Sequence, residues 1–335
     1  MSGRELREPT GAPHAGILGV GAYRPRRLVS NAEICERIDS SDEWIQTRSG
    51  IKNRRFAEAD ETVQAMSVAA GGKALASAGV RADEVGCVIV ATVSHLLQTP
   101  SVAAAIAEEL GTRPAAAFDV SAACAGFCYG VALGSDMVRG GSATYALVIG
   151  VERLSDLLDL EDRGTAFIFA DGAGAVLIGP AERPGIGPVV WGADGSQYDL
   201  IRQKETWSDA FSADQPAWPN LTMEGGPVFR WAAYEMAKVA EDAMERAGIS
   251  AEDLDVFIPH QANMRITDVM AKALKLPSSV RIARDIAEQG NTSAASVPLA
   301  LDSMLASGEA KSGDTALLIG FGAGLTYAAQ VVVLP

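Results

Sequence analysis

The sequence predicts an α/β protein whose two halves repeat the same order of elements, helix–strand–helix–strand. Residues 74–90, ALASAGVRADEVGCVIV, resemble residues 243–259, AMERAGISAEDLDVFIP, at a shift of 169 positions. Both segments have the pattern of a helix that ends at a glycine and is followed by an apolar strand. The predicted strands are apolar throughout, which indicates sheets that are covered on both faces.

The repeat continues further along each half. Residues 143–152 and 313–324 both have the pattern of a buried strand ending in glycine, and SAACAG from Ser121 resembles SAASVP from Ser293. Corresponding strands are 59 positions apart in one half and 60 in the other. Any α/β protein can produce such coincidences, but agreement in order and spacing over four elements favours a duplication. The small residues of the two predicted helices would let them pack closely between two sheets.

The seam between the halves is expected in PAERPGIGP, residues 180–188. We therefore divide the chain into an N-terminal half, residues 1–183, and a C-terminal half, residues 184–335. A chain of 335 residues with 48% hydrophobic residues can bury a large core, as two domains or as one large layered unit.

Charge and composition exclude several functional classes. The formal net charge of −14 argues against nucleic acid as a partner, because phosphate binding depends on basic contacts. Apolar runs stay far below the roughly 20 residues of a membrane span, and the N-terminus lacks the apolar region of a secretory signal. The four cysteines form no CxxC pair and no metal-ligand spacing with histidine, so we expect no metal site. They are interpreted as reduced thiols of a cytoplasmic protein.

Cys124 is the candidate nucleophile. It follows a predicted strand over residues 117–120 and lies where SAA opens a helix. Free N–H groups and the partial positive charge at a helix start are expected to lower the pKa of a thiol and can bind an oxyanion. Cys128, one turn further on, gains neither benefit and is predicted to pack in the core. Taken alone, Cys124 would also fit simple packing among small residues.

Two polar residues of the second half are candidate partners of the thiol. Of the three histidines, only His260 ends a predicted strand, where sites of α/β proteins usually lie; a plain loop histidine is the alternative. Asn291 precedes the second small-residue helix and could simply be its N-cap. The duplication, however, places it near the counterpart of Cys124. The glycine loop GFGAG, residues 320–324, could supply a second oxyanion N–H; no predicted helix follows it, so it is a weak nucleotide motif.

The motifs SAACAGF, HQAN, GNTSAAS and GFGAG, in this order and spacing, resemble β-ketoacyl-acyl-carrier-protein synthase III of the thiolase superfamily. DSSDEWIQTRSGI (residues 39–51), DRGTAFIFADGAGA (residues 162–175) and PHQANMRI extend the resemblance over nearly the whole chain. IGVERLSDLLDLEDR and FGAGLTYAAQVVVLP are most similar to actinobacterial members, including those that prime aromatic polyketides. The resemblance implies a thiolase-like fold, with two duplicated βαβαβ halves in a five-layered αβαβα arrangement.

The resemblance also implies an acyltransferase that condenses an acyl-CoA primer with malonyl-acyl carrier protein. The product is a 3-oxoacyl-acyl carrier protein that starts fatty acid or polyketide synthesis. Cys124 would carry the acyl group as a thioester, and the N–H groups of Cys124 and Ala323 would hold its oxyanion. His260 and Asn291 would hydrogen-bond the malonyl thioester oxygen and stabilise the enolate. Many members have Gly where Ala323 stands, but a backbone donor survives that change.

Substrate-binding positions of the family can be carried over residue by residue. The positions that bind CoA match Trp44, Arg48, Arg163, Gly164 and Asn263. Adenine can stack between an indole and a guanidinium group, and arginines can pair with phosphates. Taken alone, the tryptophan and the arginines would indicate ordinary packing and solvated charge.

The acidic acyl carrier protein implied by the resemblance needs a basic patch on this acidic chain. Arg230, Arg265 and Lys272 match basic positions around the tunnel mouth of the family. Arg265 and Lys272 are seven residues apart and share one face if the segment is helical. Two basic residues at this spacing would also occur on an ordinary solvent-exposed helix face.

Thr99 is the expected acyl-pocket residue. In acetyl-preferring relatives a Phe contributed across the dimer lies near the end of this pocket, and the matching position here is Thr99. Because Thr is smaller than Phe, we expect primers longer than acetyl to be accepted, such as propionyl-, butyryl- or isobutyryl-CoA. Refilling of the space by Leu96, Leu97 or Met66 would cancel this effect.

The implied partners are acyl-CoA, malonyl-acyl carrier protein and a second copy of the chain, with no permanently bound cofactor, no nucleic acid and no membrane.

Other condensing enzymes of the superfamily are disfavoured by single residues. A thiolase needs a second cysteine in residues 320–324, an elongating synthase has His where Asn291 stands, and a hydroxymethylglutaryl-CoA synthase has Glu where Val93 stands. A catalytically silent acyl-binding or scaffold protein stays open as an alternative. A nicotinamide-dependent oxidoreductase is weaker, because GILGVGAYRP lacks the full GxGxxG followed by a helix.

Overall fold

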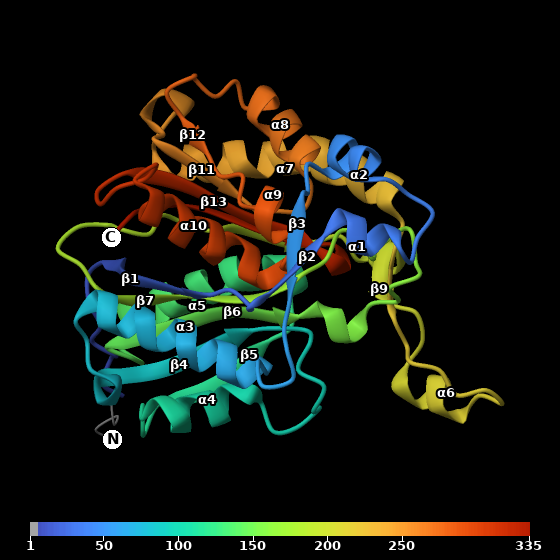
Figure 1. Ribbon diagram of the computed structural model, residues 1–335. Helices are drawn as coiled ribbons and strands as arrows, with labels where there is room; N and C mark the ends of the chain where they lie inside the picture. The colour runs from blue at the N-terminus through green and yellow to red at the C-terminus, as the bar shows by residue number, and fades with distance from the viewer. Residues whose placement is uncertain (1–5) are drawn as a thin grey trace.

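The computed structural model describes residues 6–335 and contains two five-stranded sheets (Figure 1). The first sheet has the order β1-β7-β6-β4-β5, with β1 Ala15–Tyr23, β7 Asp171–Pro180, β6 Tyr145–Arg153, β4 Val85–Ala91 and β5 Ala116–Val120. The second has the order β8-β14-β13-β11-β12, with β8 Val190–Ala193, β14 Thr326–Val333, β13 Thr315–Gly322, β11 Val256–Pro259 and β12 Arg281–Ile282. In each sheet the first three strands pair antiparallel and the last three pair parallel. The two sheets therefore have the same topology.

Helices complete five layers. Helices α5 (Gly126–Gly140) and α10 (Ser296–Ser307) lie between the two sheets (Figure 1). The outer face of the first sheet is covered by α3 (Val63–Ala78) and α4 (Val102–Leu110), and that of the second by α7 (Gly225–Ala247) and α8 (Met264–Ala273). Gly150 of β6 lets the second half approach closely, because a Cβ there would lie 2.2 Å from the carbonyl oxygen of Ala294. The predicted αβαβα arrangement agrees with this structure.

The repeat found in the sequence is visible in local detail. Helices α3 and α7 both end at a glycine in the left-handed region, Gly79 (φ 65°) and Gly248 (φ 73°). Each glycine is followed by a short 3₁₀ turn, η1 (Ala82–Glu84) and η5 (Ala251–Asp253), and then by a buried strand. Because glycine adopts positive φ without strain, it can end a helix and turn the chain back onto the sheet.

One part of the predicted repeat is wrong in register. The turns η2 (Ala123–Ala125) and η6 (Ser293–Ala295) precede α5 and α10, and each begins on a non-glycine residue of positive φ, Ala123 (45°) and Ser293 (48°). These two residues are therefore equivalent. The comparison of the two sequence segments paired Ser121 with Ser293, a register error of two positions. The small residues of both segments carry no local marker of the unusual turn. Asn291 is instead the counterpart of Ser121.

The remaining elements lie outside the repeat and surround one end of the sheets (Figure 1). The insertion after β1 contains β2 (Arg27–Ser30), α1 (Asn31–Cys35), α2 (Asp42–Ser49) and β3 (Asn53–Phe56). The insertion after β8 contains η4 (Gly195–Leu200), β9 (Ile201–Gln203), α6 (Trp207–Ser212) and β10 (Leu221–Met223). The shorter turns are η3 (Leu154–Leu157), α9 (Ile286–Gln289) and η7 (Ala323–Leu325).

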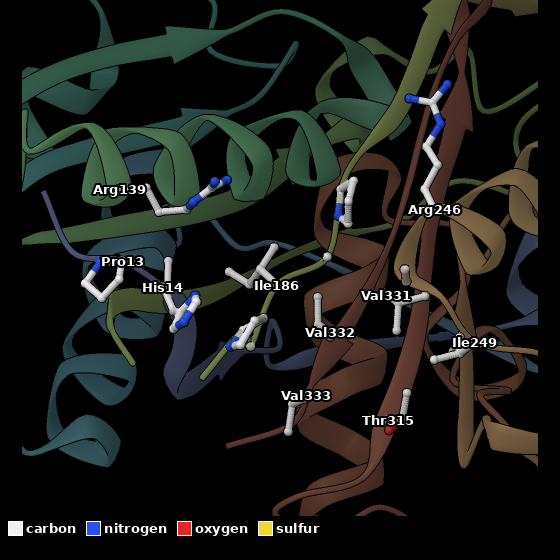
Figure 2. Close-up of a pocket in the computed structure, with 16 residues that line it drawn as sticks. Pro13, His14, Arg139, Ile186, Arg246, Ile249, Thr315, Val331, Val332 and Val333 are labelled. Atoms are coloured by element: carbon white, nitrogen blue, oxygen red, sulfur yellow. The ribbon is translucent and has the colours of Figure 1, made fainter. Parts of the chain in front are cut away.

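A cavity of about 570 Å³ lies at the seam between the halves and is lined by residues near both chain termini, such as Pro13 and Val333 (Figure 2). It is lined by His14, Arg139, Arg246 and apolar residues from both halves. Figure 2 shows that the guanidinium groups of Arg139 and Arg246 lie apart, so the charges do not converge on one point.

The strands of the first sheet lie within residues 15–180 and those of the second within residues 190–333.

The described residues contain no helix that is long and apolar enough to cross a membrane. Over the same range, residues 6–335, no group of His, Cys, Asp and Glu is placed to hold a metal ion. The four cysteines are free thiols, and Cys128 is fully buried in the core between the sheets.

Candidate active site

Cys124 lies where two cavities meet. It follows β5 in the turn η2 and is 8% exposed. A narrow cavity of about 70 Å³ connects Cys124 with His260 and Asn291. A wider one of about 350 Å³ is also lined by Cys124 and includes Ala323. Cys124 therefore borders both cavities.

Two backbone N–H groups lie near the thiol. The N–H groups of Cys124 itself and of Ala323 both lower the pKa of the thiol. Gly322 makes this approach possible, because a Cβ at that position would lie 2.7 Å from both Cβ and Sγ of Cys124. The glycines of GFGAG thus serve the close approach of a backbone to the cysteine.

The expected lowering of the Cys124 pKa is not found. Burial raises the pKa of this thiol to about 12, against the smaller lowering effects of the Ser293 side chain and of the two backbone N–H groups. The sequence places the thiol at a helix start, but it gives no measure of how completely the second half covers it. Desolvation of the thiolate outweighs the helix end here, so the thiol requires a proton acceptor.

His260 is positioned by Ser296. It follows β11, is 3% exposed, and its Nδ1 lies 2.6 Å from the hydroxyl oxygen of Ser296. The same oxygen accepts from the N–H of Gln261 at 3.3 Å, which leaves the Ser296 hydrogen free to donate to Nδ1. With the hydroxyl donating to Nδ1, the imidazole proton is on Nε2. Burial lowers the pKa of His260 to about 3, which keeps the ring neutral at physiological pH.

Asn291 is held by its amide oxygen. Oδ1 accepts from the N–H of Ser293 at 2.9 Å, and the backbone of Asn291 is bonded to Ile168 and Ala170. Asn291 is therefore not the N-cap that the sequence also allowed: the N-cap of η6 is Thr292, and the Asn291 bond lies one residue before the turn. It fixes the orientation of the amide, because the Nδ2 group must then point away from the turn. Since Asn291 lines the narrow cavity, this nitrogen is available as a donor near Cys124.

Two serines and one acid of this site were missed from the sequence. Ser293 adjoins the Cys124 thiol and donates to Glu152, while Ser296 orients His260. Glu152 lies fully buried near the end of β6. A single acid ending the apolar strand ATYALVIGVE was the one signal that could have drawn attention to it.

The predicted CoA-binding residues gather around α2. The ring of Trp44 lies 4.8 Å from the guanidinium carbon of Arg163 and 5.8 Å from that of Arg48. Asn263, the N-cap of α8, lines the narrow cavity and donates to the carbonyl oxygen of Arg48 at 3.0 Å. Gly164 is exposed beside Arg163. Trp44, Arg48 and Arg163 therefore lie together on the surface, and Asn263 connects Arg48 to the lining of the narrow cavity.

The predicted basic patch lies on two packed helices. Arg265 and Lys272 are both on α8 and Arg230 is on α7, and all three are exposed. The guanidinium carbon of Arg265 lies 5.1 Å from the ring of Phe229, whose side chain lines the narrow cavity. Thr99 is exposed in the loop after β4 and does not line the wide cavity of its own chain, whereas Val93 of that loop does.

Comparison with known proteins agrees with this site. The chain is 61% identical over 331 residues to a β-ketoacyl-[acyl-carrier-protein] synthase III of Streptomyces glaucescens, covering 99% of each protein. The chain belongs to the β-ketoacyl-acyl-carrier-protein synthase III family. A family model described as 3-oxoacyl-[acyl-carrier-protein] synthase III matches residues 118–195, and its C-terminal counterpart matches residues 244–334.

Further relatives support the same family. A synthase III of Mycobacteroides abscessus is 56% identical over 333 residues, covering 99% of this chain and 98% of the relative. The crystal structure of the priming β-ketosynthase from the R1128 polyketide pathway superposes with a TM-score of 0.97 at 48% identity and 99% coverage of both chains. The predicted family, thiolase-like fold and condensing-enzyme class are thereby confirmed. The roles of individual residues stay predictions.

Proposed function

We propose that this synthase III family member condenses an acyl-CoA primer with malonyl-acyl carrier protein on Cys124, giving a 3-oxoacyl-acyl carrier protein and carbon dioxide. The reaction would start fatty acid or polyketide synthesis. The observation that carries the proposal is that Cys124 lines two cavities, one lined also by His260 and Asn291 and the other with room for an acyl chain. The acyl-CoA is a substrate and needs no resident cofactor.

In the first half-reaction, the sulfur of Cys124 attacks the thioester carbonyl of acyl-CoA. The N–H groups of Cys124 and Ala323 influence the pKa of the thiol, and in this proposal they receive the carbonyl oxygen as it becomes negative. Preorganised donors of this kind lower the barrier because they need no rearrangement during the reaction. CoA leaves, and the acyl group occupies the wide cavity.

In the second half-reaction, the malonyl thioester enters the narrow cavity. Nε2–H of His260 and the Nδ2 group of Asn291 donate to its thioester oxygen, which becomes an enolate oxygen when carbon dioxide is lost. The carbanion attacks the acyl-Cys124 carbonyl, a C–C bond forms, and the bond to sulfur breaks. A neutral His260 suits this role, because it donates without exchanging its proton.

For substrate delivery, we assign Trp44, Arg48, Arg163, Gly164 and Asn263 to CoA. The guanidinium group of Arg163 over the Trp44 ring supports a stacking site for adenine. We assign Arg230, Arg265 and Lys272 to the acidic carrier protein, since a local basic patch can steer it despite the net charge of −14.

Three further assignments belong to this proposal. The chain works as a cytoplasmic homodimer, in which Thr99 of a second copy closes the wide cavity. Division into halves at residues 183 and 184 is supported by the two sheets, which draw their strands from either side of this point. The free thiols fit a reducing compartment.

Mass spectrometry after exposure to a panel of acyl-CoAs tests the proposal. We expect one acyl adduct, located on the peptide that contains Cys124, absent in Cys124→Ala and retained in the matched control Cys128→Ala. Adding malonyl-carrier protein should then remove the adduct and release carbon dioxide. An adduct on another cysteine would refute the role of Cys124, and an adduct that malonyl-carrier protein never removes would favour the silent acyl-binding alternative.

A further inference from the structure

A buried carboxyl group lies one hydroxyl group away from the Cys124 thiol. Glu152 is fully buried, and the hydroxyl of Ser293 donates to its Oε1 at 3.2 Å. The side chains of Ser293 and Cys124 both line the wide cavity, and Ser293 lowers the pKa of the thiol. The Ser293 hydroxyl of the second half is therefore bonded to the carboxyl group and adjoins the thiol of the first half.

The two oxygens of Glu152 have different surroundings. Oε2 accepts from Ser94 Oγ at 2.6 Å, from Val93 N–H at 3.2 Å and from Thr92 Oγ1 at 3.3 Å. Among the described residues, Ser293 is the one donor to Oε1. Since Oε2 is saturated with donors, a proton taken up by this carboxyl group belongs on Oε1, the oxygen that faces Ser293.

The electrostatic surroundings allow the group to gain and lose a proton. Burial raises the pKa of Glu152 to about 7, against the lowering effect of its hydrogen bonds. Within residues 6–335 no cationic side chain forms an ion pair with it; its neighbour Arg153 pairs with Asp156 at 3.1 Å. Cys124 is the titratable group that faces it from η2, and Asp171 on the adjacent strand β7 is bonded elsewhere.

We propose that Glu152, acting through Ser293, accepts the Cys124 proton during acyl loading and returns it when the condensation frees the thiol. The inference rests on the proposed role of Cys124 as the nucleophile. Ser293 is suited to the relay because it adjoins both groups, and its backbone is held at φ 48° by the turn η6. Such unfavourable backbone conformations are typical of functional positions.

The proton and the bonds balance over the cycle. During loading, the S–H bond breaks, the proton passes to the Ser293 oxygen, and the Ser293 hydrogen passes to Oε1 of Glu152. A bond forms between sulfur and the acyl carbon, CoA leaves as a thiolate, and solvent water protonates it. During condensation the bond between sulfur and the acyl carbon breaks. The Cys124 thiolate then recovers a proton along the same path in reverse.

A purely structural role for Glu152 would have a different signature. The carboxylate also connects the loop at residues 92–94 to η6, so its removal could loosen the site without any proton transfer. Such a change would lower the loading rate at every pH by a similar factor. A proton acceptor instead determines how the loading rate depends on pH.

The test measures the rate of Cys124 acylation by acyl-CoA alone, over a range of pH, for wild type and Glu152→Gln. In wild type we expect the rate to rise with pH and level off above about 7, as Glu152 ionises. In Glu152→Gln we expect the neutral-pH rate to fall about 10²-fold, the lower end for a lost general base. The rate should then keep rising into the alkaline range, because the thiol itself must ionise.

Three variants sharpen the result. Glu152→Asp should retain the levelling-off, and Ser293→Ala should behave like Glu152→Gln. If Glu152→Gln does not fold, Ser293→Ala still tests the relay. Alanine is compatible with this turn, because Ala123 adopts a similar positive φ at the equivalent position. Asp171→Asn is the matched control: its carboxyl group is buried with a pKa raised to about 6, yet it has no bond to this chain of groups, so the wild-type pH profile should persist.

The outcomes separate this inference from the proposed function. A pH profile of Glu152→Gln or Ser293→Ala that matches wild type in shape would overturn the relay. Peptide mapping of the same samples shows where the acyl group lies. An adduct on Cys124 with an unchanged profile refutes the relay alone, whereas an adduct on another residue refutes the role of Cys124 and the relay with it.

Discussion

Asn291→Asp should separate the two half-reactions. In this variant an oxygen replaces the Nδ2 group, while Oδ1 still accepts the Ser293 N–H bond of 2.9 Å. The turn is therefore preserved and only the donor into the narrow cavity is lost. The new oxygen also faces the forming enolate with a negative or partly negative charge. Loading of Cys124 is assigned to the backbone N–H groups of Cys124 and Ala323, so it should change little.

The expected magnitude follows from these contacts. Removing one preorganised donor typically lowers a rate about 10²–10³-fold, equal to about 2.7–4 kcal/mol. We expect this loss in carbon dioxide release from malonyl-carrier protein, with acylation by acyl-CoA within a few-fold of wild type. Asn291→Ala serves as the comparison, because it loses the bond to Ser293 as well, which costs about 0.5–1.5 kcal/mol of stability.

The assay follows the two steps separately, by rapid-quench measurement of acyl-Cys124 and by release of labelled carbon dioxide. Decarboxylation that stays within a few-fold of wild type in Asn291→Asp would refute the assigned role of the amide. Equal losses in loading and decarboxylation would show instead that Asn291 organises the whole site.

Three further predictions concern neighbouring residues. Ser296→Ala removes the partner of His260 Nδ1, so the Nε2–H tautomer is no longer favoured; carbon dioxide release should fall by about tenfold or more, while acyl loading continues. Gly322→Ala places a Cβ 2.7 Å from the Cys124 sulfur and should abolish acylation in a protein whose circular dichroism is unchanged. Thr99→Phe should shift competition between primers towards acetyl-CoA, by about fourfold for each methylene excluded at about 0.8 kcal/mol; an unchanged acetyl preference would contradict the pocket argument.

Local signals were sufficient to predict the repeated order of helices and strands, whereas the five-layered arrangement was implied by the resemblance to the family. The glycines at 79 and 248 end their helices by conformational freedom that no other residue shares, and the apolar strands after them leave no polar face. Both signals depend on residues that are close together in the chain, so they can be recognised in a single sequence. The turn at Ala123 is different, because alanine carries no sign of a positive φ, and the repeat was misaligned there by two residues.

The site was predicted only in part, because its electrostatics depend on contacts between distant segments. The motifs identify Cys124, His260 and Asn291, but the Cys124 pKa depends on burial by the opposite half, which no local pattern measures. Glu152 lies 141 residues from Ser293 in the chain, and it contacts the site only because β6 ends beneath η6.

The position of the site follows from the duplication itself. Each half contains the same unusual turn before its central helix, and with Ala123 equivalent to Ser293, Cys124 is equivalent to Ala294. The two turns meet between the sheets, where the second half presents a hydroxyl group to the thiol of the first. One turn thus supplies the nucleophile, and its counterpart supplies Ser293 and Asn291. Because the two copies have different residues at equivalent positions, a symmetric pair of turns forms one asymmetric site. Cys124→Ala makes the two turns alike at this position and should therefore remove acylation while leaving the fold intact.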